Sequence, residues 1–283
     1  VTSNPLRKVP MQPLVNQVSD IARTAGAAIL EIYNTDFAQY EKSDSSPLTE
    51  ADLAAHHIIC DSLAKISDYP VLSEESPKED ITWEKRRQWQ TYWLVDPLDG
   101  TKEFIKKNDE FTVNIALIQK GRAVLGVVYC PPLDRMYFAA DEIGAYRQDG
   151  KGEAVKLSVA SEPQAEQPWN VVGSRSHGAE ALAAFSQQLG EVNLVSMGSS
   201  LKLCLVAEGA AHLYPRLAPT CEWDTAAAQA VVEHAGGQVL TPTLEKLQYG
   251  QKEDLLNPYF IVCAKAGERW SAVFAELAQP EQA

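Results

Sequence analysis

Four apolar runs between residues 92 and 140 constrain the fold of this chain more than any other feature. The first run is typical of a buried strand, while the apolar residues of the other three alternate or cluster as in antiparallel strands, and Lys120-Gly121 is a turn signal between the second and third runs. We expect the first strand to stop at Asp96-Pro97, because proline cannot continue a central ladder. The four predicted strands are Tyr92–Val95, Thr112–Gln119, Ala123–Tyr129 and Met136–Ala140.

Helical patterns flank these strands. In residues 12–33, apolar side chains recur every three or four positions, which predicts a long amphipathic helix. A second helix is expected from Thr49 to Ile66, with Asp52 in its first turn. A short strand over residues 69–73 follows it. Farther along, we expect strands over residues 169–173, 193–197 and 211–214 and helices over residues 179–189, 200–208 and 225–235.

These elements predict a layered α/β fold. We expect an N-terminal α+β lobe over residues 1–158 and a C-terminal α/β lobe over residues 159–283. The 283 residues are enough for two packed lobes that share a core, so we expect the two lobes to form one compact unit.

Composition and charge narrow the class of protein. No run approaches the ~18–20 apolar residues that span a bilayer. The five cysteines are scattered, which favours reduced thiols in a cytoplasmic protein over disulfides or a zinc site. A net charge of −13 argues against a nucleic-acid partner, because phosphate backbones require a basic surface. An acidic protein that handles an anionic substrate needs cations, and divalent metal ions are the usual source.

Acidic residues at the predicted ends of strands and starts of helices suggest a metal site. Mg²⁺ prefers carboxylate, carbonyl and water oxygens. Asp96 and Asp99 are three residues apart in a tight turn, so both can reach one ion, and the Leu98 carbonyl adds a third oxygen. Glu74 and Asp224 stand at comparable positions elsewhere in the chain.

The same turn can serve a phosphate. Gly100 allows close approach of the backbone, and the amides of Gly100 and Thr101 open a helix, whose N-terminus favours anions. The alternative is a helix-capping turn, in which Asp99 and Asp224 act only as caps. The combination of all these acidic residues favours the metal site.

Three segments resemble the motifs of the lithium-sensitive inositol monophosphatase superfamily. They are Glu74–Ser76, Trp93–Thr101 and Trp223–Ala227, in that order along the chain. Within the superfamily, Val71–Glu75 and Tyr92–Ile118 most resemble the bacterial CysQ branch of 3′(2′),5′-bisphosphate nucleotidases. The resemblance covers most of the chain.

The resemblance implies a layered αβαβα fold of the inositol monophosphatase and fructose-1,6-bisphosphatase type. It implies hydrolysis of adenosine 3′,5′-bisphosphate (3′-phosphoadenosine 5′-phosphate) to AMP and phosphate, linked to sulfate assimilation. It also implies two or three Mg²⁺ ions and inhibition by Li⁺. The expected location is cytoplasmic. Some CysQ-type proteins are peripheral to the inner face of the cell membrane, but no basic amphipathic helix supports that here.

The family's metal ligands match five residues of this chain. The first ion would be held by Glu74, Asp96 and the Leu98 carbonyl, and the second by Asp96, Asp99 and Asp224. A third ion would rest on Glu74 and waters. The resemblance thus implies a multi-metal site rather than a phosphoenzyme nucleophile.

The implied catalytic residues are Asp52 and Thr101, which would orient and deprotonate the attacking water, together with Glu74. The reacting phosphate would lie against residues of the metal turn and the later helix. These contacts are Leu98, Asp99, Gly100, Thr101 and Asp224.

The nucleotide contacts implied by the resemblance are His177, Ser199, Lys202 and Arg216, with His177 near the adenosine. A second phosphate needs a cationic partner, for which Lys202 and Arg216 are suited. The cation that meets the 5′-phosphate stays open, because other lysines are available. They are Lys102, Lys106 and Lys107.

Two alternatives stay open at this point. An inositol monophosphatase or sugar bisphosphatase would share the metals and the mechanism but not the nucleotide pocket. A non-catalytic regulatory protein that binds metal or phosphate belongs to another class. Asp52 and Thr101 argue against a pure binder, since binding alone needs no pair that activates water. The oligomeric state cannot be read from the sequence.

Overall fold

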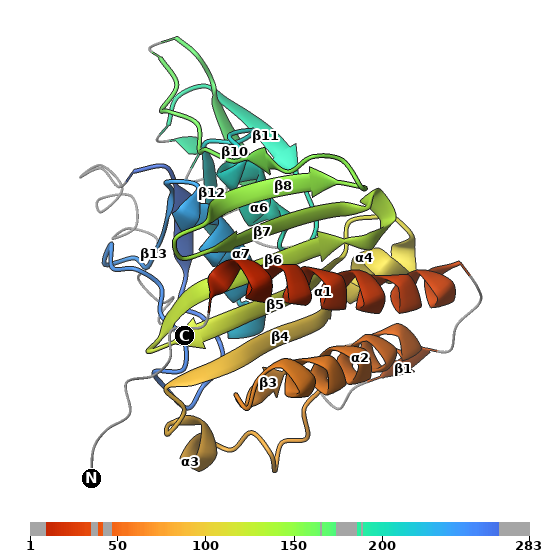
Figure 1. Cartoon of the computed structure of the whole chain (residues 1–283). Coiled ribbons are helices and arrows are strands. Elements are labelled where there is room, and N and C mark those ends of the chain that lie inside the picture. Colours follow the sequence, from red (N-terminus) through yellow and green to blue (C-terminus); the bar gives the residue numbers. More distant parts are fainter. Residues whose placement is uncertain are drawn as a thin grey trace.

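Helices and sheets alternate in layers, which Figure 1 shows for a computed structural model that describes residues 10–34, 39–41, 47–164, 166–173, 186–187 and 189–265. The helices of this part are α1 (Met11–Tyr33), α2 (Glu50–Ile66), α3 (Trp83–Arg86), α4 (Thr101–Lys106), η1 (Pro131–Leu133), α6 (Leu201–Ala207) and α7 (Glu222–His234). Its strands are β1 (Gln39–Glu41), β2 (Pro47–Thr49), β3 (Val71–Ser73), β4 (Thr91–Asp99), β5 (Thr112–Gln119), β6 (Arg122–Cys130), β7 (Arg135–Ala140), β8 (Gly144–Asp149), β9 (Val155–Lys156), β10 (Trp169–Gly173), β11 (Val192–Ser196), β12 (Leu213–Arg216), β13 (Gln238–Leu240) and β14 (Phe260–Cys263).

The larger sheet has seven strands in the order β3-β4-β5-β6-β7-β8-β9. Strands β3 and β4 are parallel, and every other neighbouring pair is antiparallel. The four strands predicted between residues 92 and 140 are therefore confirmed as β4 to β7. Strands β8 and β9 were not predicted and extend the sheet at one edge.

Helices α1 and α2 cover one face of this sheet (Figure 1). The buried side chains of α1 recur at the helical period that the sequence predicts. They pack with α2 and with side chains from alternate positions of the sheet strands into one apolar cluster. The α1 residues involved are Leu14, Val15, Val18, Ile21, Ala22, Ala25, Ile29 and Tyr33.

Strand β4 corrects the prediction that the ladder ends at Asp96-Pro97, because it continues to Asp99. Asp96 pairs with Asn114 and Asp99 with Thr112, so the register shifts between them. Pro97 therefore lies in a bulge, where its missing N–H costs little. Since β3 pairs with β4 only as far as Val95, this end of β4 is also an edge.

Helix α7 packs on the other face of the sheet, and α6 lies beside it. The sequence of α7 is rich in alanine, so this helix can approach the sheet closely. Gly126 on β6 makes this approach possible, since a Cβ there would clash with the Ala227 carbonyl oxygen. The position of α7 brings its first turn, with Asp224, to the end of β4.

The smaller sheet has the order β11-β10-β12-β14-β13. Strand β10 is parallel to β11 and β12, while β14 is antiparallel to β12 and β13. The layered α/β class is confirmed by this arrangement. The helix predicted over residues 179–189 lies mostly outside the described residues. One buried apolar cluster contains residues from both predicted lobes, and the division at residue 158 stays a prediction.

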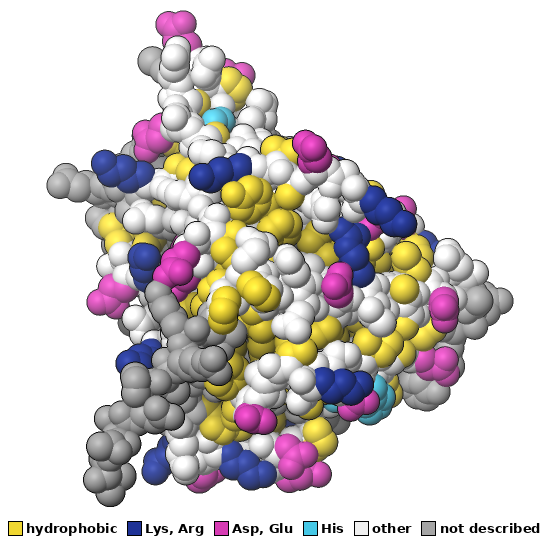
Figure 2. Space-filling model, in the orientation of Figure 1, with side chains coloured by type: hydrophobic (Ala, Val, Ile, Leu, Met, Phe, Trp, Pro, Cys, Tyr) yellow, Lys and Arg dark blue, Asp and Glu magenta, His cyan; other side chains and the backbone are white. Residues whose placement is uncertain are grey.

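The described surface carries no strongly basic region on the side seen in Figure 2, where Lys and Arg are interspersed with Asp, Glu and apolar side chains. No described helix combines the length and apolar character needed to cross a membrane.

Candidate metal centre and substrate cleft

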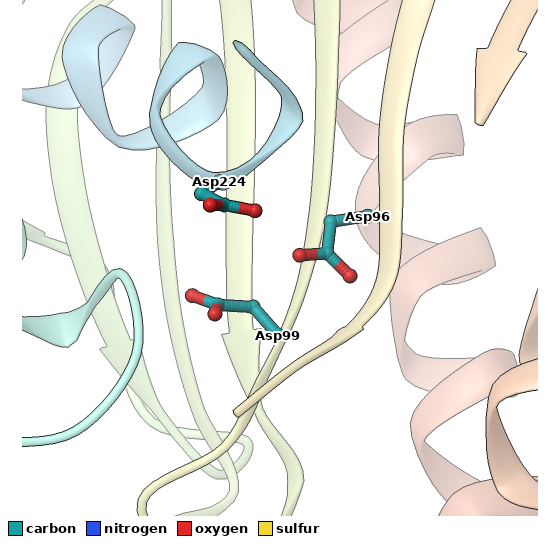
Figure 3. Close-up of side chains that lie close together, drawn as sticks. All are labelled: Asp96, Asp99 and Asp224. Carbon is teal, nitrogen blue, oxygen red and sulfur yellow. The ribbon is translucent and has the colours of Figure 1, made fainter. Parts of the chain in front are cut away.

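Three aspartates meet at the end of the large sheet (Figure 3). Asp96 and Asp99 come from the bulged end of β4, and Asp224 comes from the first turn of α7. One carboxylate oxygen from each residue lies within 4.8 Å of the others. The side chains point toward a common centre, so they can serve as ligands of a metal ion.

Backbone N–H groups orient two of these carboxylates. The Leu98 N–H donates to Asp96 Oδ1 over 3.0 Å, within the turn itself. The Ser200 N–H donates to Asp99 Oδ2 over 2.6 Å, from a loop a hundred residues away in sequence. Each carboxylate is thus held in one orientation and keeps its second oxygen for an ion, as is usual for metal ligands.

Asp224 is oriented by the residues that precede it. Its Oδ2 accepts hydrogen bonds from Thr220 Oγ1 (2.6 Å) and from the Cys221 N–H (2.8 Å). Cys221 is the N-cap of α7, and its thiol in turn accepts the Asp224 N–H. This reciprocal cap explains why α7 begins at Glu222 and not, as the sequence predicts, at residue 225.

Burial and neighbouring negative charge raise the pKa values of Asp96 and Asp99. Burial, followed by the charges of Glu74 and Asp99, raises the pKa of Asp96 well above its usual range. Burial and the charge of Asp224 raise the pKa of Asp99 to about 7, although Lys202 opposes the shift. A divalent cation would offset this repulsion, and three converging carboxylates are the hard oxygen donors that Mg²⁺ prefers. The residues therefore fit a metal ion.

The other predicted metal and catalytic residues surround this centre. Glu74 follows β3, where its N–H donates to the Val95 carbonyl over 3.1 Å, and its charge acts on Asp96. Thr101 Oγ1 lies 3.5 Å from Asp52 Oδ2 and 3.5 Å from the Leu98 carbonyl oxygen. The Asp52 carboxylate, which is 1% exposed, is thus brought next to the turn.

Gly100 joins β4 to α4. Its φ of +93° lies in the left-handed region, and a Cβ there would come within 3.3 Å of the Glu110 carbonyl oxygen. Glycine is therefore required at this position. Helix α4, whose N-terminus the sequence predicts to bind phosphate, is short, with six residues.

A cleft of about 150 Å³ extends from Asp99, Gly100 and Asp224 toward basic residues. Ser199, Lys202 and Arg216 all line it, as the sequence predicts, whereas His177 lies outside the described residues. The alternative cation Lys102 also lines the cleft, from an exposed position. The acidic and the basic predicted residues therefore share one site.

Lys202 and Arg216 are held differently. Lys202 is 7% exposed, its Nζ lies 5.9 Å from the centre of the Tyr214 ring, and burial lowers its pKa to about 8. The Arg216 guanidinium donates to the carbonyl oxygens of Ala218 (3.0 Å) and Pro219 (2.6 Å) in its own loop.

Several residues of the cleft were not predicted. The Ser200 hydroxyl bonds Thr112 and Asn114 on β5 at 2.8 Å each, which fixes the loop whose N–H holds Asp99. The pair of serines before the helical pattern at residue 201 is a capping signal that could have indicated this loop. No sequence signal pointed to Glu103 or Tyr214, which also line the cleft.

Comparison with known sequences identifies relatives over nearly the whole chain. Residues 11–282 match the inositol monophosphatase family. The 3′(2′),5′-bisphosphate nucleotidase CysQ of Salmonella typhimurium is 49% identical over 254 residues, which are 88% of this chain and 99% of the relative. The CysQ of Escherichia coli K12 is 49% identical over 252 residues, with the same coverage.

Solved structures agree with this result. CysQ from Bacteroides thetaiotaomicron, described as a bacterial member of the inositol monophosphatase family, matches with a TM-score of 0.80 and 44% identity. The match covers 92% of this chain and all of that one. An inositol monophosphatase of Thermotoga maritima shares the fold, with a TM-score of 0.74 at 21% identity over 95% of this chain and 99% of that one. The resemblance read from the motifs is confirmed, and the chain belongs to the inositol monophosphatase family of phosphoric monoester hydrolases.

Proposed function

We propose that this chain is a Mg²⁺-dependent 3′(2′),5′-bisphosphate nucleotidase that hydrolyses 3′-phosphoadenosine 5′-phosphate to AMP and phosphate. The relatives named as 3′(2′),5′-bisphosphate nucleotidases support the substrate class. In the cell this reaction would remove a by-product of sulfate assimilation. The cytoplasmic location expected from the cysteines stays a prediction, and we do not extend it to the membrane surface.

The observation that carries this proposal is the charge distribution of one cleft. Its acidic end, at Asp99 and Asp224, can hold metal ions and one phosphate. Its other end presents Lys202 and Arg216, which can meet a second phosphate. A substrate with two phosphates on one nucleoside matches both ends, whereas a monophosphate needs only the first.

The proposed metal ligands follow from the positions described above. Glu74, Asp96 and the Leu98 carbonyl would hold one ion, and Asp96, Asp99 and Asp224 a second, with Glu74 available to a third. The chemistry that bound Mg²⁺ supplies is a lower pKa for the attacking water and positive charge beside the leaving oxygen.

The chain's own residues handle the proton. Asp52, beside Thr101 Oγ1, is placed to accept the proton of the attacking water through that hydroxyl. The water oxygen bonds to phosphorus while the bond from phosphorus to the 3′ oxygen breaks, and that oxygen takes a proton from solvent. The products are AMP and phosphate, so no covalent enzyme intermediate is needed.

Ser199 supports a substrate contact at the basic end. It is 8% exposed, and among the described residues its buried hydroxyl has no hydrogen-bond partner. Its φ of +46° is unusual for a residue other than glycine, and the residue lines the cleft. A substrate oxygen would satisfy this hydroxyl, whose burial is otherwise costly.

Side-by-side kinetics test the proposal. Phosphate release from 3′-phosphoadenosine 5′-phosphate and from inositol 1-phosphate would be measured with Mg²⁺ and with EDTA. We expect the nucleotide to be favoured in kcat/KM by at least about 100-fold, which corresponds to roughly 2.7 kcal/mol, and EDTA to abolish turnover. A preference for inositol phosphate or a sugar bisphosphate would overturn the substrate assignment. Binding of the nucleotide without turnover would favour a regulatory protein.

A further inference from the structure

A segment over residues 249–257, here called the strap, lies against the first turn of α7. The Glu222 N–H donates to the Leu255 carbonyl oxygen over 2.9 Å, and the Asn257 N–H donates to the Thr220 carbonyl oxygen over 2.8 Å. The strap therefore hydrogen-bonds to the residues on either side of Cys221, the N-cap of α7. This turn carries Asp224, a proposed metal ligand.

The Asn257 side chain adds two hydrogen bonds between the strap and this turn. Its Nδ2 donates to the Cys221 carbonyl oxygen over 2.8 Å and to Thr225 Oγ1 over 3.0 Å. Asn257 is 9% exposed, so these bonds are shielded from water. Both amide protons are thus used on the turn, one before Asp224 and one after it.

Residues of the same turn also hold the Asp224 carboxylate. Thr220 Oγ1 and the Cys221 N–H both donate to Asp224 Oδ2, so any shift of these two residues rotates the carboxylate. Asn257 binds both of them, through its own N–H to Thr220 and through Nδ2 to Cys221. A change in the position of Thr220 or Cys221 would therefore change the orientation of the carboxylate that would meet the ion.

We infer that Asn257 is a positioning residue that orients Asp224 toward the second metal ion. This inference rests on the proposed function, since it concerns the same metal centre. Outer partners of metal ligands typically contribute about 10- to 100-fold to metal affinity. Asn257 does not itself line the cleft, but its partners Thr220 and Thr225 do, so Mg²⁺ affinity measured without substrate is the readout that isolates its effect on the metal site.

The rest of the strap is built to keep Asn257 in place. The Tyr249 hydroxyl lies 3.1 Å from Thr225 Oγ1 and donates to Gln229 Oε1 over 2.6 Å, one turn farther along α7. Tyr249 is fully buried, so this end of the strap is anchored in the core. The first residue of the strap is therefore fixed to α7, the helix whose first turn Asn257 binds.

The test is Mg²⁺ titration by isothermal calorimetry of the full chain and of the Asn257→Ala variant, without substrate. Asp224→Asn marks which binding event belongs to the second ion. We expect Asn257→Ala to weaken that event by about 10- to 100-fold, with kcat recovering at high Mg²⁺. Asn257→Ser, which keeps one donor, should lie between the two and replaces Asn257→Ala if the latter does not fold.

His212→Leu is the matched control, because it also removes one side-chain hydrogen bond to the backbone, to the Asn170 N–H in the smaller sheet. Equal Mg²⁺ affinity of Asn257→Ala and the wild type would overturn the inference about Asn257 but not the proposed function. The same loss in His212→Leu would also overturn it, since the effect would then be general. If the wild type bound no Mg²⁺, the proposed function itself would fail.

Discussion

The two ends of the cleft are constructed in different ways. At the acidic end, each of three carboxylates accepts a backbone N–H, from Leu98, Ser200 or Cys221, so its orientation is set before any ligand arrives. At the basic end, Lys202 lies over an aromatic ring and Arg216 donates to carbonyl oxygens of its own loop. The carboxylates are oriented by backbone N–H donors, whereas the two cations are held by an aromatic ring and by backbone carbonyl oxygens.

This difference separates two tasks. The acidic end concentrates like charges, which costs stability until a cation binds, and its rigid geometry suits a metal that demands regular coordination. The basic end holds cations at the positions where a second phosphate would bring negative charge. We therefore expect changes at the acidic end to remove catalysis and changes at the basic end to alter substrate choice.

The largest expected effect is that of Asp99→Asn. The variant should lower kcat by about 10³-fold or more, because even outer partners of metal ligands are worth about 10- to 100-fold. Phosphate release at saturating Mg²⁺ measures this loss. In EDTA the same variant should unfold at an equal or higher temperature than the wild type, since it removes one of the repelling charges.

Asp80→Asn provides the control for this variant, because Asp80 is an exposed residue outside the cleft. Asp80→Asn should change neither kcat nor the unfolding temperature in EDTA. Full activity of Asp99→Asn with Mg²⁺ would contradict the metal role of the acidic end.

A smaller effect is expected from Lys202→Gln at the basic end. Loss of a buried charged contact, roughly 1.5–3 kcal/mol, should raise KM for 3′-phosphoadenosine 5′-phosphate by about 10- to 100-fold. Lys102→Gln is the matched control, since Lys102 lines the same cleft but is exposed. It should change KM by less than about 5-fold and only at low salt. The reverse ranking would assign the second phosphate to Lys102.

The fold could be predicted wherever a pattern was local. The period of α1 and the runs of β4 to β7 predicted their elements, because burial of one helix face or one strand depends on neighbouring residues. The continuation of β4 past Pro97 could not be predicted. It depends on where β3 ends, which is a fact about the neighbouring strand and not about the run itself.

In the candidate site, too, residues close together in sequence could be predicted and contacts between distant segments could not. Asp96 and Asp99 could be predicted as a pair because one turn holds both. Their partner Ser200 could not, since the bond from its N–H joins segments a hundred residues apart. The start of α7 was missed because cysteine is an uncommon cap, although Cys221 fills that role here.

Lithium should inhibit through the acidic end. Li⁺ resembles Mg²⁺ in size but carries one charge less, so in the second site it would stabilise the leaving oxygen poorly. We expect millimolar or lower LiCl to reduce turnover several-fold at moderate Mg²⁺, whereas KCl at the same ionic strength should not. Turnover unaffected by Li⁺ would count against a second ion of the proposed type.

The smallest expected effect is the pH dependence of stability without metal. Burial and the charge of Asp224 raise the pKa of Asp99 from its ordinary value of 3.8 to about 7 in the folded chain. A carboxyl with a raised folded pKa stabilises the fold below its unfolded pKa, and this contribution is lost as pH rises through 7. In EDTA, the unfolding temperature should therefore fall by several degrees between pH 5 and 7.5, at roughly 2–4 °C per kcal/mol.

Lys202 should not obscure this trend, because its pKa is lowered from 10.5 to about 8 and its contribution to stability therefore changes mainly above this pH range. Excess Mg²⁺ should abolish or reverse the dependence, since it binds the ionised carboxylates. Asp99→Asn in EDTA should weaken it without removing it, because the pKa values of Asp96 and Glu222 are also raised by burial. Thermal unfolding followed by circular dichroism measures all of these, and a wild-type unfolding temperature that rose toward pH 7.5 in EDTA would show that the acidic end is not under charge strain.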